Sequence, residues 1–274
     1  MSFYDRLTTS INKQKSLLCV GLDPILEKIP AHIQQDSYPF FAFNKAIIDA
    51  THDLVMAYKP NSAFYEALGA QGIQELKMTC DYIHSRYPEI LIILDAKRAD
   101  IGNTNEGYVK YAFQYLQADA ITLQPYLGQE AIQPFLDLKD KGCIILCRTS
   151  NPGASEFQDL KVSDKTMYKT VAIAIADKWN SNNNCMLVVG ATYSEELAEI
   201  RKLVADLPIL VPGIGAQGGD LEKTLIAGLT AEKSGVIINA GRSIIYASNG
   251  EDFAEKARAE AEKLNNAINE QRAL

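Results

Sequence analysis

Residues 90–104 read Ile-Leu-Ile-Ile-Leu-Asp-Ala-Lys-Arg-Ala-Asp-Ile-Gly-Asn-Thr, so that four charged side chains directly follow a short apolar run. The apolar part, 90–94, has the length and the β-branched content of a buried strand. Successive residues of a strand point to opposite sides, so Asp95 and Lys97 are expected to share one face. The stretch predicts a buried strand with charge gathered at its carboxyl end.

The chain is then expected to pass through a loop into a helix. Asp100 lies on this loop, which Gly102 ends, and either Asn103 or Thr104 can cap the helix that follows. Charges after a buried strand often mark only the point where the chain meets solvent. A functional interpretation is favoured here because the strand is very apolar and because other strand ends carry matching polar groups.

Short apolar runs recur along the whole chain, and segments with helical periodicity separate them. The expected strands are 16–24, 55–61, 90–94, 120–125, 143–150, 186–190, 208–212 and 235–240. The expected helices are 40–54, 69–86, 103–118, 127–141 with an interruption at Pro134, 167–180, 195–205 and a charged surface helix at 251–268.

This alternation, without a linker or a change in composition, predicts one domain over residues 1–274, a single (β/α)8 TIM barrel. A doubly wound open sheet shows the same alternation. The count of eight strands, and the polar residues after six of them, favour the closed barrel. In such barrels the active site lies at the carboxyl ends of the strands.

Composition narrows the class of protein. The 274 residues are 47% hydrophobic and 22% charged, as in an ordinary soluble globular protein. The net charge of −7 argues against a nucleic-acid partner, although a few local donors could still hold a small anion. The five cysteines form no CxxC pair, and residues 1–14 resemble no signal peptide. Since no apolar run approaches the ~20 residues of a membrane span, a cytoplasmic protein with no membrane association is expected.

Glycine-rich segments follow the seventh and eighth strands. Residues 213–220 contain four glycines, and Gly241-Arg242 comes directly after the last strand. In barrels this region often builds a phosphate site from backbone N–H groups, and an arginine adds a forked donor that matches phosphate oxygens. The alternative is that the glycines only make tight turns; the accompanying Arg242 favours the phosphate site.

Other catalytic classes find little support. The three histidines lie on expected loops or helices and form neither a metal-ligand spacing nor a triad, so proton chemistry is assigned to Lys, Asp or Glu. No dinucleotide fingerprint follows the first strand. We therefore expect no metal and no organic cofactor.

The motif Asp95-x-Lys97-x-x-Asp100, followed by Ile-Gly-Asn-Thr, closely resembles the signature of orotidine 5′-monophosphate decarboxylases. With Arg98 inside the signature, the chain resembles the bacterial type 2 group. The resemblance spans nearly the whole chain. It implies decarboxylation of orotidine 5′-monophosphate to UMP and CO2 in de novo pyrimidine biosynthesis, without a cofactor.

The resemblance also implies roles for single residues. Lys97 would protonate the carbanion left by CO2, and Asp95 would hold Lys97 in place. Lys59 matches a catalytic lysine after the second strand, and Asp23 matches an acid that contacts the ribose. Gly21 stands where some relatives carry a serine, so one ribose contact would be missing or supplied differently.

Further positions match the family's binding residues. Gln217 and Arg242, with Gly241, would contact the phosphate, and either Ser150 or Asn151 would recognise the pyrimidine. The family is dimeric, so Asp100 and Thr104 are expected to reach into the site of the neighbouring subunit.

Two other functions remain open at this point. One is a magnesium-dependent decarboxylase of phosphosugars from the same superfamily, although such relatives carry an acid where Lys59 stands. The other is a non-catalytic barrel that binds phosphometabolites; it would need the phosphate site but not Lys97.

Overall fold

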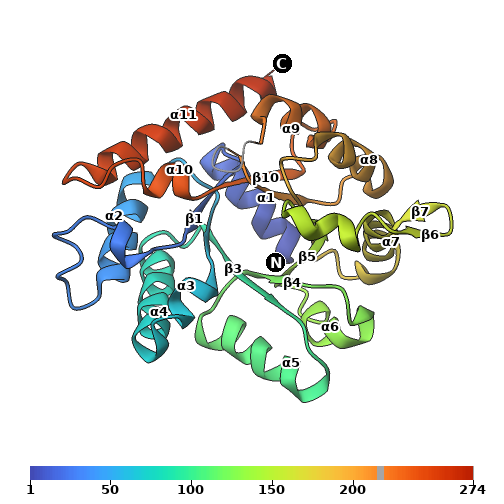
Figure 1. The fold of residues 1–274 in the computed structure, drawn as a ribbon, viewed down its shortest axis with the longest axis horizontal. Coiled ribbons are helices and arrows are strands. Elements are labelled where there is room, and N and C mark those ends of the chain that lie inside the picture. Colours follow the sequence, from blue (N-terminus) through green and yellow to red (C-terminus); the bar gives the residue numbers. More distant parts are fainter. Residues whose placement is uncertain (215–218, 274) are drawn as a thin grey trace.

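The computed structural model describes residues 1–214 and 219–273, and its main feature is a closed parallel barrel (Figure 1). The strand order around the barrel is β1-β10-β9-β8-β5-β4-β3-β2. This closure confirms the predicted TIM barrel and excludes the open sheet. The strands are β1 (Leu18–Leu22), β2 (Ala57–Pro60), β3 (Leu91–Arg98), β4 (Ala120–Leu123), β5 (Gly142–Arg148), β8 (Cys185–Val189), β9 (Ile209–Pro212) and β10 (Val236–Ala240).

Helices form the outer ring of the barrel (Figure 1). The longer ones are α2 (Pro39–Thr51), α4 (Gly69–Arg86), α5 (Gly102–Val109), α6 (Gly128–Leu136), α7 (Met167–Ala174), α8 (Ser194–Val204), α9 (Leu221–Gly228) and α11 (Phe253–Ala273). Two short helices, α3 (Ser62–Glu66) and α10 (Arg242–Ile245), follow β2 and β10. π-Helical turns at Lys110–Tyr115 and Ile175–Trp179 continue α5 and α7.

Several helix ends differ from the sequence-based expectation. α5 begins at Gly102 after Ile101, without a side-chain cap, so the prediction that Asn103 or Thr104 caps it was wrong. Asn105 is the polar residue that stabilises this turn, because its Oδ1 accepts a hydrogen bond from the Asp100 N–H at 2.9 Å. α6 contains Pro134 and ends two residues later, so it is shorter than predicted.

An amino-terminal helix that was not among the predicted elements closes the bottom of the barrel. α1 (Phe3–Gln14) starts with a capping box made by Ser2 and Asp5. Its side chains bond to groups where barrel strands begin: Ser10 donates to the Met56 carbonyl at 2.7 Å, and Arg6 pairs with Asp119 at 2.5 Å. α1 therefore covers the end of the barrel opposite to the strands' carboxyl ends.

The barrel core is continuous and apolar. Every residue of β1, β8 and β10 is buried, as expected for parallel strands covered on both faces. All five cysteines are buried free thiols, and burial raises the pKa of Cys19 to about 12. Within residues 1–214 and 219–273, no helix has the length and apolar character to cross a bilayer.

Between β5 and α7 the chain makes an excursion that the sequence did not reveal. A short antiparallel hairpin, β6 (Lys161–Val162) and β7 (Lys165–Thr166), projects from the body of the barrel on the right of Figure 1. The connection from β5 to this hairpin also contains a 3-10 turn, Pro152–Glu156. This excursion carries side chains that line the cavity described below.

Candidate active site

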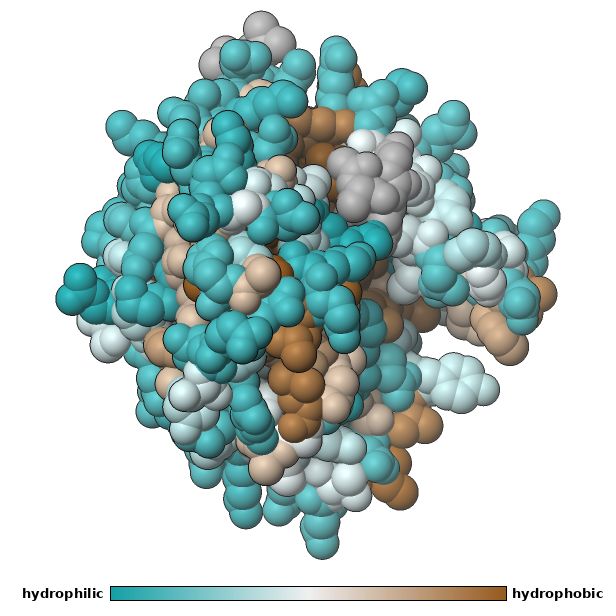
Figure 2. Space-filling model, turned by 60° about the vertical axis from the view of Figure 1, so that its left-hand side comes forward, coloured by the Kyte–Doolittle hydropathy of each residue, from teal (hydrophilic) through white to brown (hydrophobic). Residues whose placement is uncertain are grey.

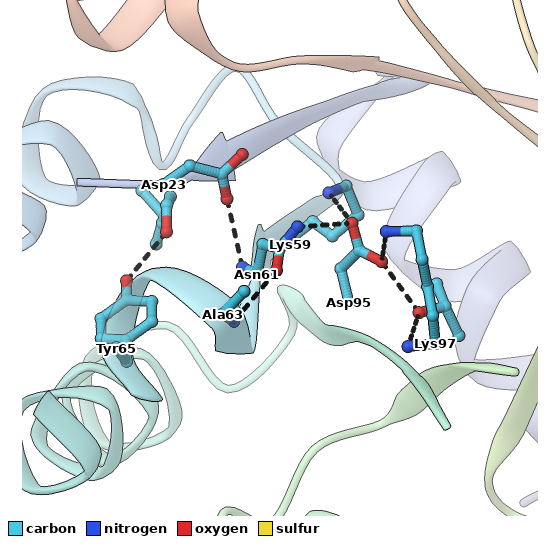
Figure 3. A network of polar contacts seen from close by, with 9 residues as sticks. Asp23, Lys59, Asn61, Ala63, Tyr65, Asp95 and Lys97 are labelled. Carbon is cyan, nitrogen blue, oxygen red and sulfur yellow. Dashed lines mark hydrogen bonds and ion pairs between the residues drawn. The ribbon is translucent and has the colours of Figure 1, made fainter. Parts of the chain in front are cut away.

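Four side chains at the carboxyl ends of neighbouring strands form one connected network (Figure 3). Lys59 of β2 donates to Asp95 Oδ2 at 2.9 Å, and Lys97 of β3 donates to Asp95 Oδ1 at 2.6 Å. Thr122 of β4 donates to the same Oδ1 at 2.8 Å. Asp95 thus lies between two ammonium groups, and Lys97 shares its face as predicted.

The backbone of β3 is distorted where it carries Lys97. The strand runs through the charged signature to Arg98, and its register with β4 shifts between Leu94 and Arg98. Lys97 has a φ of 46°, a left-handed conformation that costs free energy for any residue other than glycine. The Lys97 N–H donates to Thr122 Oγ1 at 2.9 Å, which helps to hold this conformation. Local strain therefore sets the direction of the Lys97 side chain.

Burial and charge act in opposite directions on this network. Burial alone would raise the pKa of Asp95, but Lys59 and Lys97 outweigh it, and the pKa lies well below its ordinary value. Burial alone would lower the pKa of Lys59, but Asp95 and then Asp23 outweigh it, and this pKa is raised. Asp95 is therefore a carboxylate and Lys59 an ammonium at neutral pH, although their residues are only 8% and 4% exposed.

Asp23 and Asn61 extend the network towards β1 (Figure 3). The Asn61 N–H donates to Asp23 Oδ1 at 3.1 Å, and Asn61 Nδ2 donates to Asp95 Oδ2 at 3.4 Å. Burial raises the pKa of Asp23, with Lys59 opposing the shift. Asn61 also caps α3 by accepting from the Ala63 N–H at 3.1 Å, so the helix start and the site share one residue.

β1 and β10 approach each other unusually closely beside this network. A Cβ atom added to Gly21 would lie 3.2 Å from the Gly241 Cα, which is tighter than normal packing allows. A serine at position 21 could therefore fit only if the β10 backbone moved. The glycine noted in the sequence thus has a packing reason, and Gly241 remains next to Asp23.

The network forms one wall of a cavity of about 670 Å³ at the carboxyl ends of the strands. Its floor carries apolar residues from β5, β8 and β9, namely Leu146, Val188 and Leu210. Four basic and two acidic side chains lie among the described lining residues: Lys28, Lys59, Lys97, Arg242, Asp23 and Asp95. An anion larger than a single phosphate therefore fits this space in both volume and charge.

The residues expected to bind the substrate mostly line this cavity. Ser150 and Asn151 both do so, and the geometry does not choose between them. Gly241 and Arg242 line its other side. Gln217 lies outside the described residues.

Asp100 and Thr104 are expected site residues that do not line the cavity of their own subunit. Asp100 lies on the loop after β3, where its Oδ1 accepts from the Ile101 N–H at 2.7 Å. Thr104 is exposed on α5. Arg98 also points away from the network, because its guanidinium pairs with Glu66 and lies 5.2 Å from the centre of the Tyr108 ring.

Sequence reasoning missed several polar residues of the site, among them Thr122, Asn61 and Gln158. Thr122 is the one polar residue of β4, and Asn61 directly follows the Lys-Pro end of β2, so both stand out in apolar surroundings. Gln158 gave no signal, because it lies in the excursion after β5. It accepts from the Thr149 N–H at 2.9 Å and donates to Thr149 Oγ1 at 2.8 Å, which ties this excursion to the cavity rim.

Comparisons with known proteins agree over the whole chain. The model of the orotidine 5′-phosphate decarboxylase / HUMPS family matches residues 16–257. The orotidine 5′-phosphate decarboxylase of Cellvibrio japonicus is 52% identical, over 100% of both chains, and that of Janthinobacterium is 49% identical, over 98% of both. Among solved structures, the OMP decarboxylase of Leishmania donovani is similar with a TM-score of 0.87 at 39% identity, again over 100% of both chains.

Proposed function

Because the chain belongs to the orotidine 5′-phosphate decarboxylase / HUMPS family, we propose that its cavity converts orotidine 5′-monophosphate into UMP and CO2. The enzyme is a carbon–carbon lyase of pyrimidine biosynthesis. The observation that carries the proposal is the Lys59–Asp95–Lys97 network at the edge of an anion-sized cavity. Residues 1–274 then act as one decarboxylase domain.

The reaction needs a cation and a proton at one carbon atom. When CO2 leaves carbon 6 of the pyrimidine, the electron pair of the broken bond stays on that carbon. Lys97 stabilises this carbanion as an ammonium and then transfers a proton to it, which gives UMP. Its Nζ lies 2.6 Å from Asp95, and its side chain is half exposed towards the cavity, so it can reach a bound ring.

Asp95 and Lys59 position this proton donor. Asp95 accepts hydrogen bonds from Lys97, Lys59 and Thr122, so its orientation is fixed before the substrate binds. Such preorganised charge acts without a reorganisation cost in the transition state. The carboxylate of the substrate lies near Asp95 before CO2 leaves, and the repulsion between them is relieved by the reaction.

The rest of the nucleotide is held by the cavity walls. Arg242, with Gly241, binds the phosphate, since a guanidinium offers paired donors to phosphate oxygens. Asp23 binds the ribose from the end of β1. Ser150 or Asn151 reads the pyrimidine on the opposite side of the cavity. Binding energy from the remote phosphate supports catalysis at the ring.

We further propose that the enzyme is a cytoplasmic homodimer whose sites are shared. Asp100 and Thr104 then complete the site of the neighbouring subunit, which explains why neither lines its own cavity. Large apolar side chains are exposed after β3, β4 and β5: Ile101, Tyr126, Leu127 and Phe157. The face in Figure 2 is largely hydrophilic, with apolar residues confined to a few narrow areas. Ile101 directly follows Asp100, and exposed apolar side chains of this kind suit a subunit interface.

The test mixes the purified protein with orotidine 5′-monophosphate, with and without a chelator, and measures the loss of orotate absorbance. We expect turnover at the same rate in both conditions. Loss of activity in the chelator would favour the magnesium-dependent decarboxylase instead. Binding of the nucleotide without any turnover would favour the non-catalytic barrel.

A further inference from the structure

Asn239 is a buried polar residue of the catalytic cavity that the proposed mechanism does not use. It lies on β10, is 9% exposed, and lines the cavity. Its side-chain Oδ1 is buried without a hydrogen-bond partner. Among residues 1–214 and 219–273, it is the one cavity-lining residue with such an orphaned atom.

An amide in this position has no structural benefit within the chain. Buried polar groups are nearly always hydrogen-bonded, and leaving one without a partner costs free energy. The β-ladder partners of Asn239 are Cys19 on β1 and Pro212 on β9, and neither side chain bonds to it. The neighbouring floor of the cavity is apolar, so leucine or valine would pack there without this cost. The amide therefore suits a group that arrives from outside.

The position of Asn239 in the barrel indicates which half of the nucleotide its side chain would contact. Gly241 and Arg242 follow two and three residues later, where β10 ends and α10 begins. Asp23 lies beside Gly241, on the neighbouring strand's end. Ser150 and Asn151 follow β5, and two strands, β9 and β8, separate β5 from β10. Asn239 thus lies below the ribose and phosphate, away from the pyrimidine end.

We propose that the side-chain Oδ1 of Asn239 accepts a hydrogen bond from a ribose hydroxyl in the ribose 5-phosphate half of the nucleotide. The amide oxygen only accepts hydrogen bonds, so its partner must be a donor; the ribose hydroxyls can donate, whereas phosphate and ether oxygens cannot. This role rests on the proposed function, because it assigns a further contact to the same site.

Two leucine variants test the proposal by calorimetric binding of UMP and of ribose 5-phosphate. Asn239→Leu keeps the size of the side chain but removes the acceptor Oδ1. Asn265→Leu is the matched control, because Asn265 on α11 is also buried with an unpartnered Oδ1 but does not line the cavity. We expect Asn239→Leu to raise the Kd of both ligands about five- to tenfold. Asn265→Leu should leave both Kd values unchanged.

Melting of the free protein separates binding from a structural role. Asn239→Leu removes an orphaned polar group, so its Tm should equal or exceed that of the wild type. A lower Tm with an unchanged Kd would overturn the proposal. Weaker binding of UMP but not of ribose 5-phosphate would overturn the assignment to that half. If the leucine variant does not fold, Asn239→Val is measured in the same way.

Turnover by the wild type separates this inference from the proposed function. Wild-type protein that binds UMP but does not decarboxylate orotidine 5′-monophosphate would contradict the function, while the binding measurements would still report on Asn239. Wild-type protein that binds neither UMP nor ribose 5-phosphate would overturn the inference itself.

Discussion

Lys97 combines an unusual backbone with a fixed side-chain partner. Its φ of 46° makes it one of a small number of non-glycine residues, within the described part of the chain, that have a left-handed backbone. Its N–H bonds to Thr122, and its Nζ bonds to Asp95, so both ends of the residue are held. Strain of this kind persists only where neighbouring contacts enforce it, and it is common at functional sites.

Replacing Lys97 tests whether it supplies the proton. Lys97→Ala should abolish turnover, because the carbanion loses both its nearest cation and its proton donor. Steady-state rates with orotidine 5′-monophosphate measure the effect, and circular dichroism with UMP binding serves as the control for folding. A variant within about tenfold of the wild type, a barrier change of only ~1.4 kcal/mol, would contradict the mechanism.

Asp95 is expected to stabilise the fold as well as the site. Asp95→Asn leaves Lys59 buried beside a neutral group, and breaking a buried ion pair in this way costs about 3 kcal/mol. Urea unfolding at pH 7 measures this difference in the free energy of unfolding. The control is Asp53→Asn, which breaks the exposed pair with Arg258 and should cost less than about 1 kcal/mol.

The stability difference between the wild type and Asp95→Asn should depend on pH in a definite direction. The folded-state pKa of Asp95 is lowered, so its contribution is fully present above the ordinary value of 3.8 and is lost as the pH falls towards the folded-state pKa. The stability difference between wild type and Asp95→Asn should therefore stay constant from pH 5 to 8 and shrink below about pH 3.8. A difference that grows on acidification would show that Asp95 is not a stabilised carboxylate.

At the scale of elements, α1 closes one end of the barrel and lies opposite to the cavity. It packs Phe3, Leu7 and Ile11 into the core and lies at the amino ends of the strands, while the cavity opens at their carboxyl ends. Its ion pair joins Arg6 to Asp119, and Asp119 also accepts from the Ile92 N–H at 2.8 Å. One buried carboxylate thus connects α1 with the start of β3.

Arg6→Ala should lower stability without changing catalysis. The substitution leaves Asp119, which is 1% exposed, with one charged partner fewer, and the expected loss is about 1–3 kcal/mol. Thermal unfolding and kcat/KM for the decarboxylation measure the two effects separately. Lys45→Ala, which breaks an exposed pair with Asp49, is the matched control and should change little. A large fall in kcat/KM at unchanged stability would mean that α1 communicates with the site.

At the scale of the whole molecule, a single subunit does not bring all the expected residues together. Lys59, Asp95 and Lys97 meet within one chain, whereas Asp100 remains outside the cavity that they line. In a two-fold dimer the loop after β3 of each subunit can reach the other site. The apolar side chains exposed beside this loop would then be covered.

Mixed dimers test whether Asp100 acts across the interface. Lys97→Ala and Asp100→Ala homodimers should each be nearly inactive. Refolded together with random pairing, half of the dimers are mixed, and one site of each mixed dimer has both residues intact. Roughly a quarter of wild-type activity should therefore return. No recovery, with mixed dimers verified by mass spectrometry, would mean that Asp100 serves its own subunit.

The sequence alone determined the barrel and the location of its chemistry. Burial patterns are local, so eight apolar runs with helical segments between them identify the strands without knowledge of their contacts. The charge after 90–94 marked the strand end that carries the Asp95–Lys97 pair, and a helix at 69–86 has the predicted bounds. The roles of Lys97 and Arg242 came from resemblance to a family, because a strand-end charge has many uses.

Only the tertiary structure decided the contacts that depend on closure of the barrel and on the register of its strands. Lys59 and Asp95 are 36 residues apart, and only the pairing of β2 with β3 brings their side chains to 2.9 Å. Thr122 and Asn239 lie on strands that are distant in the sequence, and only the closed barrel brings both to one cavity. The position of α1 under the barrel depends on contacts with distant segments, such as the Arg6–Asp119 pair. Local periodicity does not predict contacts between distant segments, because each contact depends on how all the strands pair to close the barrel.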